Sequence, residues 1–164
     1  MKQPFDQAVE RHGVTVLRVC RAVLGATADA DDAWSETFLA ALETWPELPP
    51  DTNVEAWLVR VAYRKAIDVT RARARHAVPV ADVPESRTEL GVPERDEDDL
   101  WRAVGTLPEQ QRFAIAYHFF GGLTHAQTAE LIGSTEAAVR RAAANGMRTL
   151  RKTFAPEDSL KGGH

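Results

Sequence analysis

The chain has 164 residues, with 20 basic and 24 acidic side chains and a net charge of -4 at pH 7. This length suits two small helical domains, each with a core of its own. The single cysteine, Cys20, excludes an internal disulfide and a thiolate zinc site, so we expect it to be a small core residue. No apolar run is long enough for a signal peptide or a membrane-spanning helix, which predicts a cytoplasmic protein.

The charges are segregated along the chain. Residues 26–51 hold seven acidic and no basic side chains, residues 53–75 hold six basic and two acidic ones, and residues 82–99 hold eight acidic and two basic ones. Such blocks can be accidental solvated faces. Their alternation favours separate surfaces for a protein partner and for a polyanion.

Two amphipathic helices are predicted first. Apolar residues at helical spacing predict one over residues 5–24, ended by Gly25. A second is predicted over residues 31–45, because Asp31 and Asp32 suit a positive amino end and prolines follow. Its apolar stripe consists of Trp34, Phe38, Ala41, Leu42 and Trp45.

A third helix is predicted over residues 54–75, capped by Asn53 or Thr52. Its buried stripe consists of Val54, Trp57, Leu58, Val61 and Val69. The other face carries a ridge at intervals of four, four, three and four residues, formed by Arg60, Arg64, Asp68, Arg71 and Arg75. We expect Asp68 to pair with Arg64 or Arg71. Four cations then remain for phosphates: Arg60, Lys65, Arg73 and Arg75. A plain solvent-exposed face is the alternative, but three arginines in the last five residues favour a binding surface.

Residues 77–98 break the helical pattern with prolines, a glycine and many acids, which predicts an acidic flexible linker between two separate cores. The first domain is then residues 1–76 and the second is residues 99–155, with a disordered tail over residues 156–164. Apolar residues predict two helices in the second domain before Gly121 and Gly122. The fold class is all-α, since no strand-like alternation is found.

Residues 123–152 carry the spacing of a helix-turn-helix. Thr124 and Gln127 can form a capping box, Ala129 allows a close helix approach, Gly133 supplies the turn, and Val139 fills the angle between the helices. The second helix is basic through Arg140, Arg141, Arg148, Arg151 and Lys152. DNA binding is therefore the leading hypothesis. An ordinary helical hairpin with a solvated basic face is the alternative.

Three segments together resemble the extracytoplasmic-function (ECF) group of RNA polymerase sigma factors. DADDAWSETFLAALETW is similar to the family's region 2.1 to 2.2, with matches at Asp32, Glu36 and Phe38. NVEAWLVRVAYRKAIDVTRARAR is similar to region 2.3 to 2.4, with matches at Trp57, Leu58, Arg60, Ala62, Ala66 and Asp68. LPEQQRFAIAYHFFGGLTHAQTAELIG is similar to the opening of region 4, with matches at Leu107, Pro108, Arg112, Gly122, Leu123, Thr124, Ala129 and Gly133.

The resemblance implies a sigma factor that binds core RNA polymerase at its clamp helices and flap and directs promoter-specific initiation. It implies core-polymerase contacts at Asp31, Asp32, Trp34, Glu36 and Phe38. It implies −10 element contacts at Asn53, Trp57, Arg60, Arg64, Lys65, Arg71 and Arg73, although the apolar stripe favours a core role for Trp57. It implies −35 element contacts at Thr124, Ser134, Thr135, Arg140, Arg141 and Arg148. An anti-sigma factor is a further implied partner.

The chain departs from the family pattern in three places. Ser35 replaces a common glutamine, Arg64 replaces a common asparagine, and RRAAANGM replaces the basic run of the recognition helix, where we expect Gly146 to permit a bend. The alanines favour one alternative, a sigma-like regulator or helical adaptor that binds proteins without reading promoters. An enzyme is the other alternative, and the chain offers it no phosphate loop, no nucleophile motif and no helical histidine pair. We therefore expect no catalytic residue, metal or cofactor.

Overall fold

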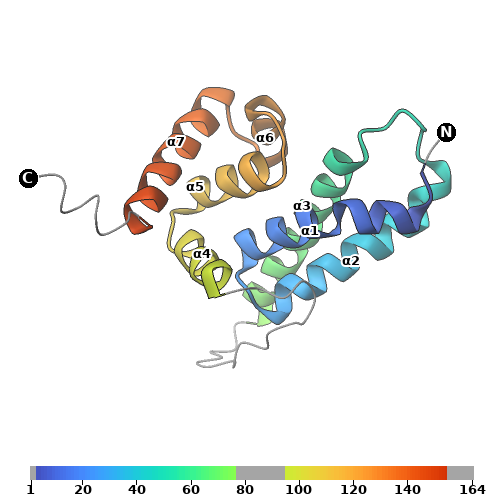
Figure 1. The fold of residues 1–164 in the computed structure, drawn as a ribbon, viewed down its shortest axis with the longest axis horizontal. Helices are drawn as coiled ribbons and strands as arrows, with labels where there is room; N and C mark the ends of the chain where they lie inside the picture. The colour runs from blue at the N-terminus through green and yellow to red at the C-terminus, as the bar shows by residue number, and fades with distance from the viewer. Residues whose placement is uncertain (1–2, 77–94, 155–164) are drawn as a thin grey trace, which may run out of the picture.

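A computed structural model describes residues 3–76 and 95–154, and all regular structure in these two stretches is helical. The elements, in chain order, are α1 (Phe5–Leu24), α2 (Ala28–Thr44), η1 (Trp45–Glu47), α3 (Val54–His76), α4 (Arg95–Gly105), α5 (Glu109–Ala114), η2 (Ile115–Phe120), α6 (His125–Ile132) and α7 (Glu136–Thr153). Figure 1 shows two helical groups side by side, α1–α3 and α4–α7. The predicted all-α fold with two helical domains is confirmed.

The first group begins and ends its helices close to the predicted positions. α1 has the predicted bounds, and Gly25 follows it with a φ of 85°. α2 starts at Ala28, three residues before the prediction, because the chain is already extended at Thr27. A 3₁₀ turn, η1, carries Pro46 and ends the run. The amide of Ala56 donates to Asn53 Oδ1 at 3.1 Å, so Asn53 is the cap of α3.

α1, α2 and α3 enclose a core of their own. It contains Val16, Cys20, Ala30, Ala33, Phe38, Ala41, Leu58 and Ala62. The predicted stripe of α2 is correct except at Leu42, which is 51% exposed. Ala41 already occupies the inward position, and one further residue turns the helix by about 100°, so Leu42 points to solvent.

The second group begins earlier than predicted. α4 starts at Arg95, so residues 95–98 belong to a helix and not to the linker. The rest of the predicted linker, residues 77–94, and the predicted tail, residues 156–164, lie outside the described residues. α5 continues into η2, a π-helical segment in which the Gly121 amide donates to Ala116 O at 2.9 Å. α6 and α7 complete the group.

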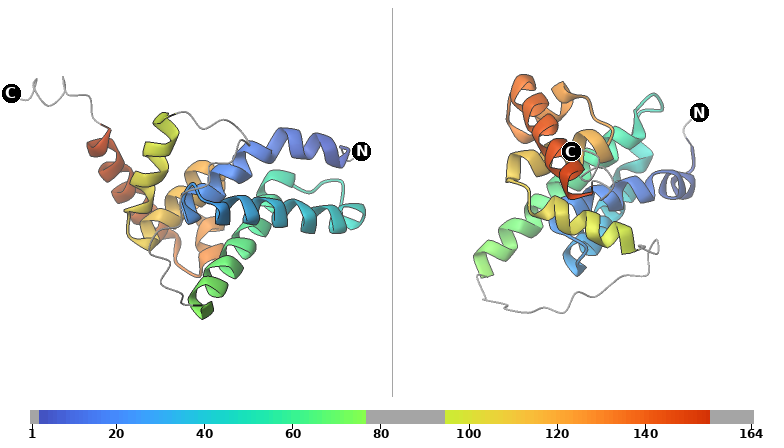
Figure 2. Two further views of the ribbon diagram at one scale, coloured as in Figure 1. Left: turned by 90° about the horizontal axis from the view of Figure 1, so that it is seen from below. Right: turned by 60° about the vertical axis from the view of Figure 1, so that its left-hand side comes forward.

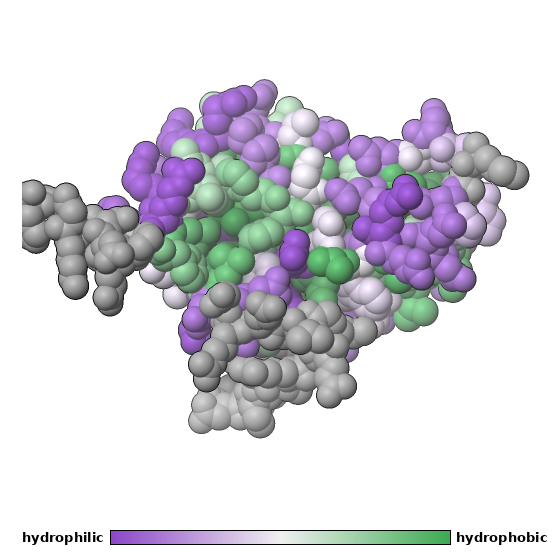
Figure 3. Space-filling view, viewed as in Figure 1, coloured by the Kyte–Doolittle hydropathy of each residue, from purple (hydrophilic) through white to green (hydrophobic). Residues whose placement is uncertain are grey.

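Besides a core within each group, the two groups share one buried cluster, which the prediction of two separate cores did not include. The first group contributes Val19 and Ala22 of α1 and Ala56 and Val59 of α3. The second contributes Trp101, Val104, Leu107, Ile115, Ala116, Tyr117, Leu123 and Leu150. α4 packs along the carboxyl-terminal part of α1 (Figure 2), and hydrophobic side chains gather over α4, α5 and α7 on the face shown in Figure 3. This contact could not be predicted, because the apolar face of a helix does not indicate which element packs against it.

Candidate nucleic-acid and protein interfaces

The helix-turn-helix forms as its sequence predicts. Thr124 Oγ1 accepts from the Gln127 amide at 3.0 Å, and Gln127 Oε1 accepts from the Thr124 amide at 2.9 Å, which completes the capping box. Gly133 is left-handed with a φ of 72° and ends α6. Ala129 and Val139 are both buried where α6 meets α7. Packing and caps therefore fix the angle at which α7 is presented.

Four arginines of α7 are exposed, Arg140, Arg141, Arg148 and Arg151, and the first three were predicted to contact the −35 element. Thr135 caps the helix by accepting from the Ala138 amide at 3.1 Å, so its side chain positions the amino end of α7. Arg140 donates to Glu136 Oε1 at 2.8 Å, and Arg148 donates to Asn145 Oδ1 at 3.1 Å. Arg141 forms no ion pair with any described residue. Two of the predicted −35 arginines are thus held by neighbours on their own helix, and Arg141 is the least restrained.

The small residues of α7 have a packing role. Ala143 and Gly146 are buried, and a Cβ at position 146 would lie 3.1 Å from Ile115 Cγ1. Gly146 stands inside one continuous helix and lets α7 approach the segment that joins α5 and η2. Ala143 of the alanine-rich run therefore faces the core of the second group. Ala144 is exposed and places no long polar side chain between Arg140 and Arg148 on the outer face.

His118 and His125 stack at the entrance to α6, a pairing that the dispersed histidines of the sequence did not suggest. Their ring centroids are 3.9 Å apart and the planes are inclined by 21°. His118 Nδ1 lies 2.7 Å from Leu123 O. Desolvation lowers the pKa of His125, and His118 and Arg140 lower it further. The lowered pKa favours the neutral form of the His125 ring.

The basic face of α3 is exposed to solvent at Arg64, Arg71 and Arg75, whereas Arg60 and Lys65 are half-buried. Arg73 was predicted to be available for phosphates, but it forms an ion pair with Asp29 of α2. The predicted pairing of Asp68 is also wrong, since Asp68 forms no ion pair within the described residues. The arginines of this ridge are therefore less neutralised by Asp68 than expected. The one restrained arginine named here, Arg73, is held by Asp29 on the neighbouring helix α2.

The amino end of α3 is occupied by structural contacts. The Asn53 side chain is used as the helix cap. Trp57 packs against Trp45 with ring centroids 6.3 Å apart, which agrees with the core role favoured by its stripe. Tyr63 is an aromatic residue of α3 that the sequence analysis missed, and its ring meets Tyr117 of η2 edge-on at 5.4 Å.

The acidic helix α2 presents only part of its predicted site. Asp32 and Glu36 are exposed, whereas Phe38 is 6% exposed and packs in the first core. A polymerase contact at Phe38 stays a prediction. Trp34 is half-buried, and its Nε1 donates to Gly13 O at 2.9 Å. Partial burial raises the pKa of Asp31, and the Arg21 guanidinium opposes that rise.

Two leucines complete the outer face of α2. Leu39 is 57% and Leu42 51% exposed, and helical spacing puts them beside Glu36 and Glu43. On a helical wheel Leu42 lies at the edge of the stripe formed by Trp34, Phe38, Ala41 and Trp45, and this position could have indicated its exposure. The face combines carboxylates with exposed apolar side chains, which is the chemistry of a protein-binding surface.

Comparison with known proteins identifies the family of the chain. Residues 8–76 match the Sigma-70 region 2 family, and residues 97–150 match the Sigma-70 region 4 family. The ECF RNA polymerase sigma factor ShbA of Streptomyces griseus is 32% identical over 152 residues, covering 82% of this chain and 79% of the relative. The chain belongs to the ECF sigma factors.

Further relatives agree with this family. The ECF RNA polymerase sigma factor SigM of Mycobacterium tuberculosis is 29% identical over 154 residues, covering 90% of this chain and 76% of the relative. The sigma factor RpoE of Bartonella quintana, solved with the anti-sigma factor NepR, has the same fold, with a TM-score of 0.73 at 17% identity over 93% of this chain and 98% of that one.

This ECF sigma factor binds core RNA polymerase and promoter DNA and directs transcription initiation, as its family does. Sigma factors are initiation factors and not enzymes. The region 2 match ends with α3 and the region 4 match begins inside α4, so the family boundaries follow the two helical groups. In the part of the chain that the structure describes, no helix is long and apolar enough to cross a membrane.

Proposed function

We propose that this ECF sigma factor divides promoter recognition among three surfaces. The outer face of α2 binds core polymerase, the basic face of α3 binds the −10 element, and α7 with the turn before it binds the −35 element. The observation that carries the proposal is the pairing, in one chain, of a fully capped helix-turn-helix with a second basic helix whose exposed arginines are largely unneutralised.

The polymerase surface rests on the chemistry of α2. Asp32 and Glu36 offer carboxylates, while Leu39 and Leu42 offer apolar area between and beside them. A mixed surface of this kind gains specificity from charge and affinity from apolar burial. Phe38 supports it from beneath by fixing α2 in the first core.

The −10 surface rests on the electrostatics of α3. Arg64 and Arg71 point to solvent, and Arg60 and Lys65 stand beside them, so a strand lying along the helix meets several cations in succession. Contacts of this kind neutralise phosphates and position the strand. Asn53 and Trp57 contribute by holding the amino end of α3, and Arg73 by its link to Asp29.

The −35 surface rests on the amino end of α7. Ser134 and Thr135 bring the chain to the helix terminus, where free amides attract a phosphate, and Thr124 caps the helix before it. Arg140 and Arg141 then face the duplex, and arginine reads guanine or binds phosphate. Arg148 extends the same face.

A sigma-like adaptor that binds polymerase without reading promoters is the second candidate. It is favoured by the exposed Ala144 and by the local hydrogen bonds of Arg140 and Arg148, which reduce the groups available to bases. Reversing the charge of Arg140 and Arg141 discriminates the two. A promoter reader loses duplex binding, whereas an adaptor loses nothing.

We further propose that the protein acts in the cytoplasm and that an anti-sigma factor regulates it. Two solved relatives support the proposal, because RpoE was solved in complex with the anti-sigma factor NepR and CnrH in complex with the cytosolic domain of CnrY. A co-purification from cells that returns only polymerase subunits contradicts the anti-sigma part.

The division of labour is tested by separating binding to polymerase from binding to DNA. Glu36→Lys and Leu42→Asp are expected to weaken association with core polymerase, while the reversals at Arg140 and Arg141 leave it unchanged. Glu10→Lys, an exposed site on α1, is the matched control for charge. If the α2 variants bind core as tightly as this control, the polymerase surface lies elsewhere.

A further inference from the structure

A tight turn brings two histidines of the second helical group face to face. Gly122 has a φ of 76°, and the Leu123 amide donates to Tyr117 O at 3.0 Å, so the chain reverses between η2 and α6. The reversal stacks His125 on His118, with ring centroids 3.9 Å apart and planes inclined by 21°. These two side chains, seven positions apart in the sequence, form one unit that we call the histidine pair.

His118 is the fixed member of the histidine pair. Its Nδ1 lies 2.7 Å from Leu123 O, and a carbonyl oxygen only accepts, so Nδ1 carries a proton and donates. Phe119 meets the same ring edge-on, with centroids 4.9 Å apart. The hydrogen bond fixes the tautomer and the orientation of the His118 ring. That ring in turn sets the position of the His125 ring stacked on it.

His125 is the available member of the histidine pair. Its side chain is half-buried, and neither of its ring nitrogens forms a hydrogen bond with a residue that the structure describes. An imidazole nitrogen can gain or lose a proton near neutral pH, so its role as donor or acceptor follows its partner. The His125 ring can therefore donate to an acceptor that arrives from outside the protein.

Groups on η2 and α7 set the charge of the His125 ring. Desolvation lowers the pKa of His125, His118 of η2 and Arg140 of α7 lower it further, and Glu136 of α7 raises it. A phosphate placed beside the ring opposes these effects, because a nearby negative charge favours the protonated form. Thr124, the residue before the ring, and Arg140 both belong to the proposed −35 surface. A duplex phosphate on that surface therefore meets His125.

We propose that the histidine pair is a proton-linked contact to a phosphate of the −35 duplex. His125 takes up a proton from solvent as the phosphate binds beside Arg140, and its ring donates to a phosphate oxygen, while His118 holds the ring in place. This proposal rests on the −35 surface proposed above. Because proton uptake and binding are linked, duplex affinity rises as the pH falls through the neutral range.

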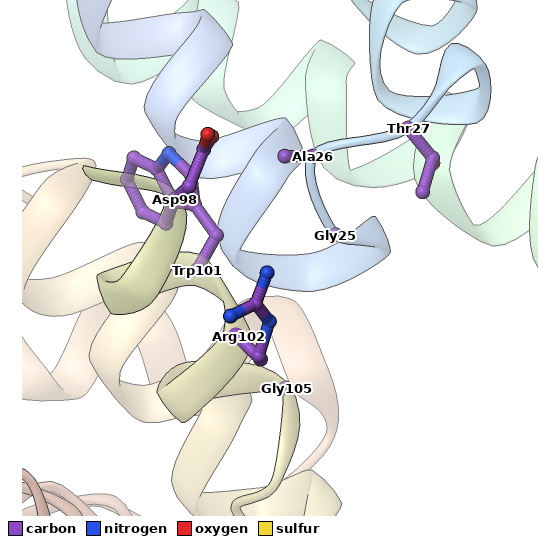
Figure 4. A pocket seen from close by; sticks show the side chains of 7 residues that line it. All are labelled: Gly25, Ala26, Thr27, Asp98, Trp101, Arg102 and Gly105. Carbon is purple, nitrogen blue, oxygen red and sulfur yellow. The ribbon is translucent and has the colours of Figure 1, made fainter. Parts of the chain in front are cut away.

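Other features that could respond to pH lie away from this surface. His12 Nδ1 is 3.0 Å from Glu55 Oε2, where α1 meets α3. A hollow of about 170 Å³ lies between residues 25–27 and α4 (Figure 4), and its described lining holds no histidine. Neither feature belongs to α6 or α7. A pH dependence of duplex binding that disappears with the His125 ring therefore comes from the histidine pair.

Duplex binding at pH 8 and pH 6 tests the proposal. A short DNA duplex of fixed sequence is titrated at constant low ionic strength, and fluorescence anisotropy measures its affinity. The parent protein carries Arg64→Glu and Arg71→Glu, so that binding reports the second helical group. We expect its affinity to be about fivefold higher at pH 6, since one proton taken up allows at most about tenfold per pH unit. Acid destabilisation of the fold would weaken binding and cannot imitate this gain.

His125→Gln in this parent is expected to bind equally at both pH values, because glutamine does not titrate. The matched control is His76→Gln at the end of α3, which makes the same chemical change and should keep the fivefold difference. If His125→Gln also keeps the full difference, the proposal is overturned. A parent that binds no duplex at either pH instead refutes the −35 surface itself, and the proposal with it.

Nuclear magnetic resonance of the His125 ring gives a readout that does not depend on affinity. Its imidazole resonances are assigned by their absence in His125→Gln. They are expected to titrate at a higher pH when the duplex is present. Inorganic phosphate at equal ionic strength is expected to give no such rise. An equal midpoint with and without duplex, or an equal rise with inorganic phosphate, contradicts a contact to the duplex.

His118→Asn tests the pairing itself. Asparagine keeps an N–H donor for Leu123 O but removes the ring that lowers the pKa of His125. The midpoint of His125 in the free protein is therefore expected to rise. An unchanged midpoint would show that the two rings do not act together, and His118 would then have no part in the contact.

Discussion

The two basic helices of this ECF sigma factor present their charges in different ways. On α3, Arg64, Arg71 and Arg75 are exposed and form no ion pair with any described residue. On α7, Arg140 is bound to Glu136 and Arg148 to Asn145. α3 is therefore arranged to attract several phosphates at once. α7 instead presents arginines such as Arg140 and Arg148 in orientations set by their neighbours.

The difference indicates two modes of recognition on one chain. Unrestrained cations give salt-dependent affinity with little geometric selection. Restrained arginines on a capped helix lose less conformational entropy on binding and act at fixed positions. Promoter affinity should depend mainly on α3, and the register of the duplex on α7. The predictions that follow separate these two contributions.

Val139→Asp should have the largest effect, because it disrupts the packing that holds α7 in place. Val139 is 1% exposed between α6 and α7, and an unpaired carboxylate there costs about 4 kcal/mol. We expect the second helical group to unfold at a lower temperature and duplex binding to be lost. Circular dichroism melting and fluorescence anisotropy with a −35 duplex measure both.

The same variant should retain the separate core of α1–α3. Binding of a single-stranded −10 oligonucleotide is therefore expected to persist. Equal loss of both activities would show that α3 depends on α7, and the two modes would not be separable.

Reversal of Arg64 and Arg71 to glutamate should come next. Each phosphate contact to a single strand contributes about 0.7 to the slope of log affinity against log salt, so losing two contacts lowers the slope by about 1.4. Titration of the −10 oligonucleotide at several salt concentrations measures the slope. Reversal of Arg11 and Arg102, which are exposed elsewhere, has the same charge change and should leave the slope near its original value.

Arg141→Ala and Arg140→Ala should differ although the residues are adjacent. If Arg141 contacts a base or a phosphate directly, its loss costs about 2 kcal/mol of duplex affinity. Arg140→Ala should cost less, because part of its charge is already satisfied by Glu136. Competition with a panel of −35 duplexes measures both variants. The opposite order would show that Arg140 is the stronger contact although it donates to Glu136.

Asp29→Asn should have the smallest effect and the opposite sign. It releases Arg73 from its ion pair, so α3 gains a cation and the salt slope rises by about 0.7. Asp99→Asn is the control, because it releases Arg102 on α4 instead. A slope that does not rise would indicate that Arg73 is too far from the bound strand.

A pH titration tests the environment of His125 at the start of α6. The pKa of His125 lies below its ordinary value of 6.5 in the folded protein, so the unfolded chain binds more protons as the pH falls. The stabilisation is therefore present above pH 6.5 and is lost as the pH falls through the folded pKa. Melting temperature should decline over this window, and His125→Gln should flatten the decline.

Local features of the fold were predictable because they depend on neighbours in sequence. The capping box at Thr124, the left-handed Gly133 and the bounds of α1 follow from spacing and backbone conformation alone. The start of α4 was misplaced because eight acidic residues in a short stretch resemble a linker, although the helix buries Trp101 on its other face.

The features that escaped prediction depend on packing between distant segments. Arg73 of α3 pairs with Asp29 of α2, His118 stacks on His125 around a turn, and Tyr63 of α3 meets Tyr117 of η2. The apolar stripe of α2 already indicated that Phe38 is a core residue, and the structure confirms this burial. Spacing along a helix indicates which residues share a face and does not indicate what that face contacts.

Promoter recognition is tested by run-off transcription of genomic fragments with purified core polymerase, with and without the protein. We expect start sites that depend on the protein and are preceded by two shared sequence elements, with Arg64 and Arg71 required at all of them. Tight binding to core polymerase without any dependent start site would contradict promoter recognition and leave the adaptor as the better account.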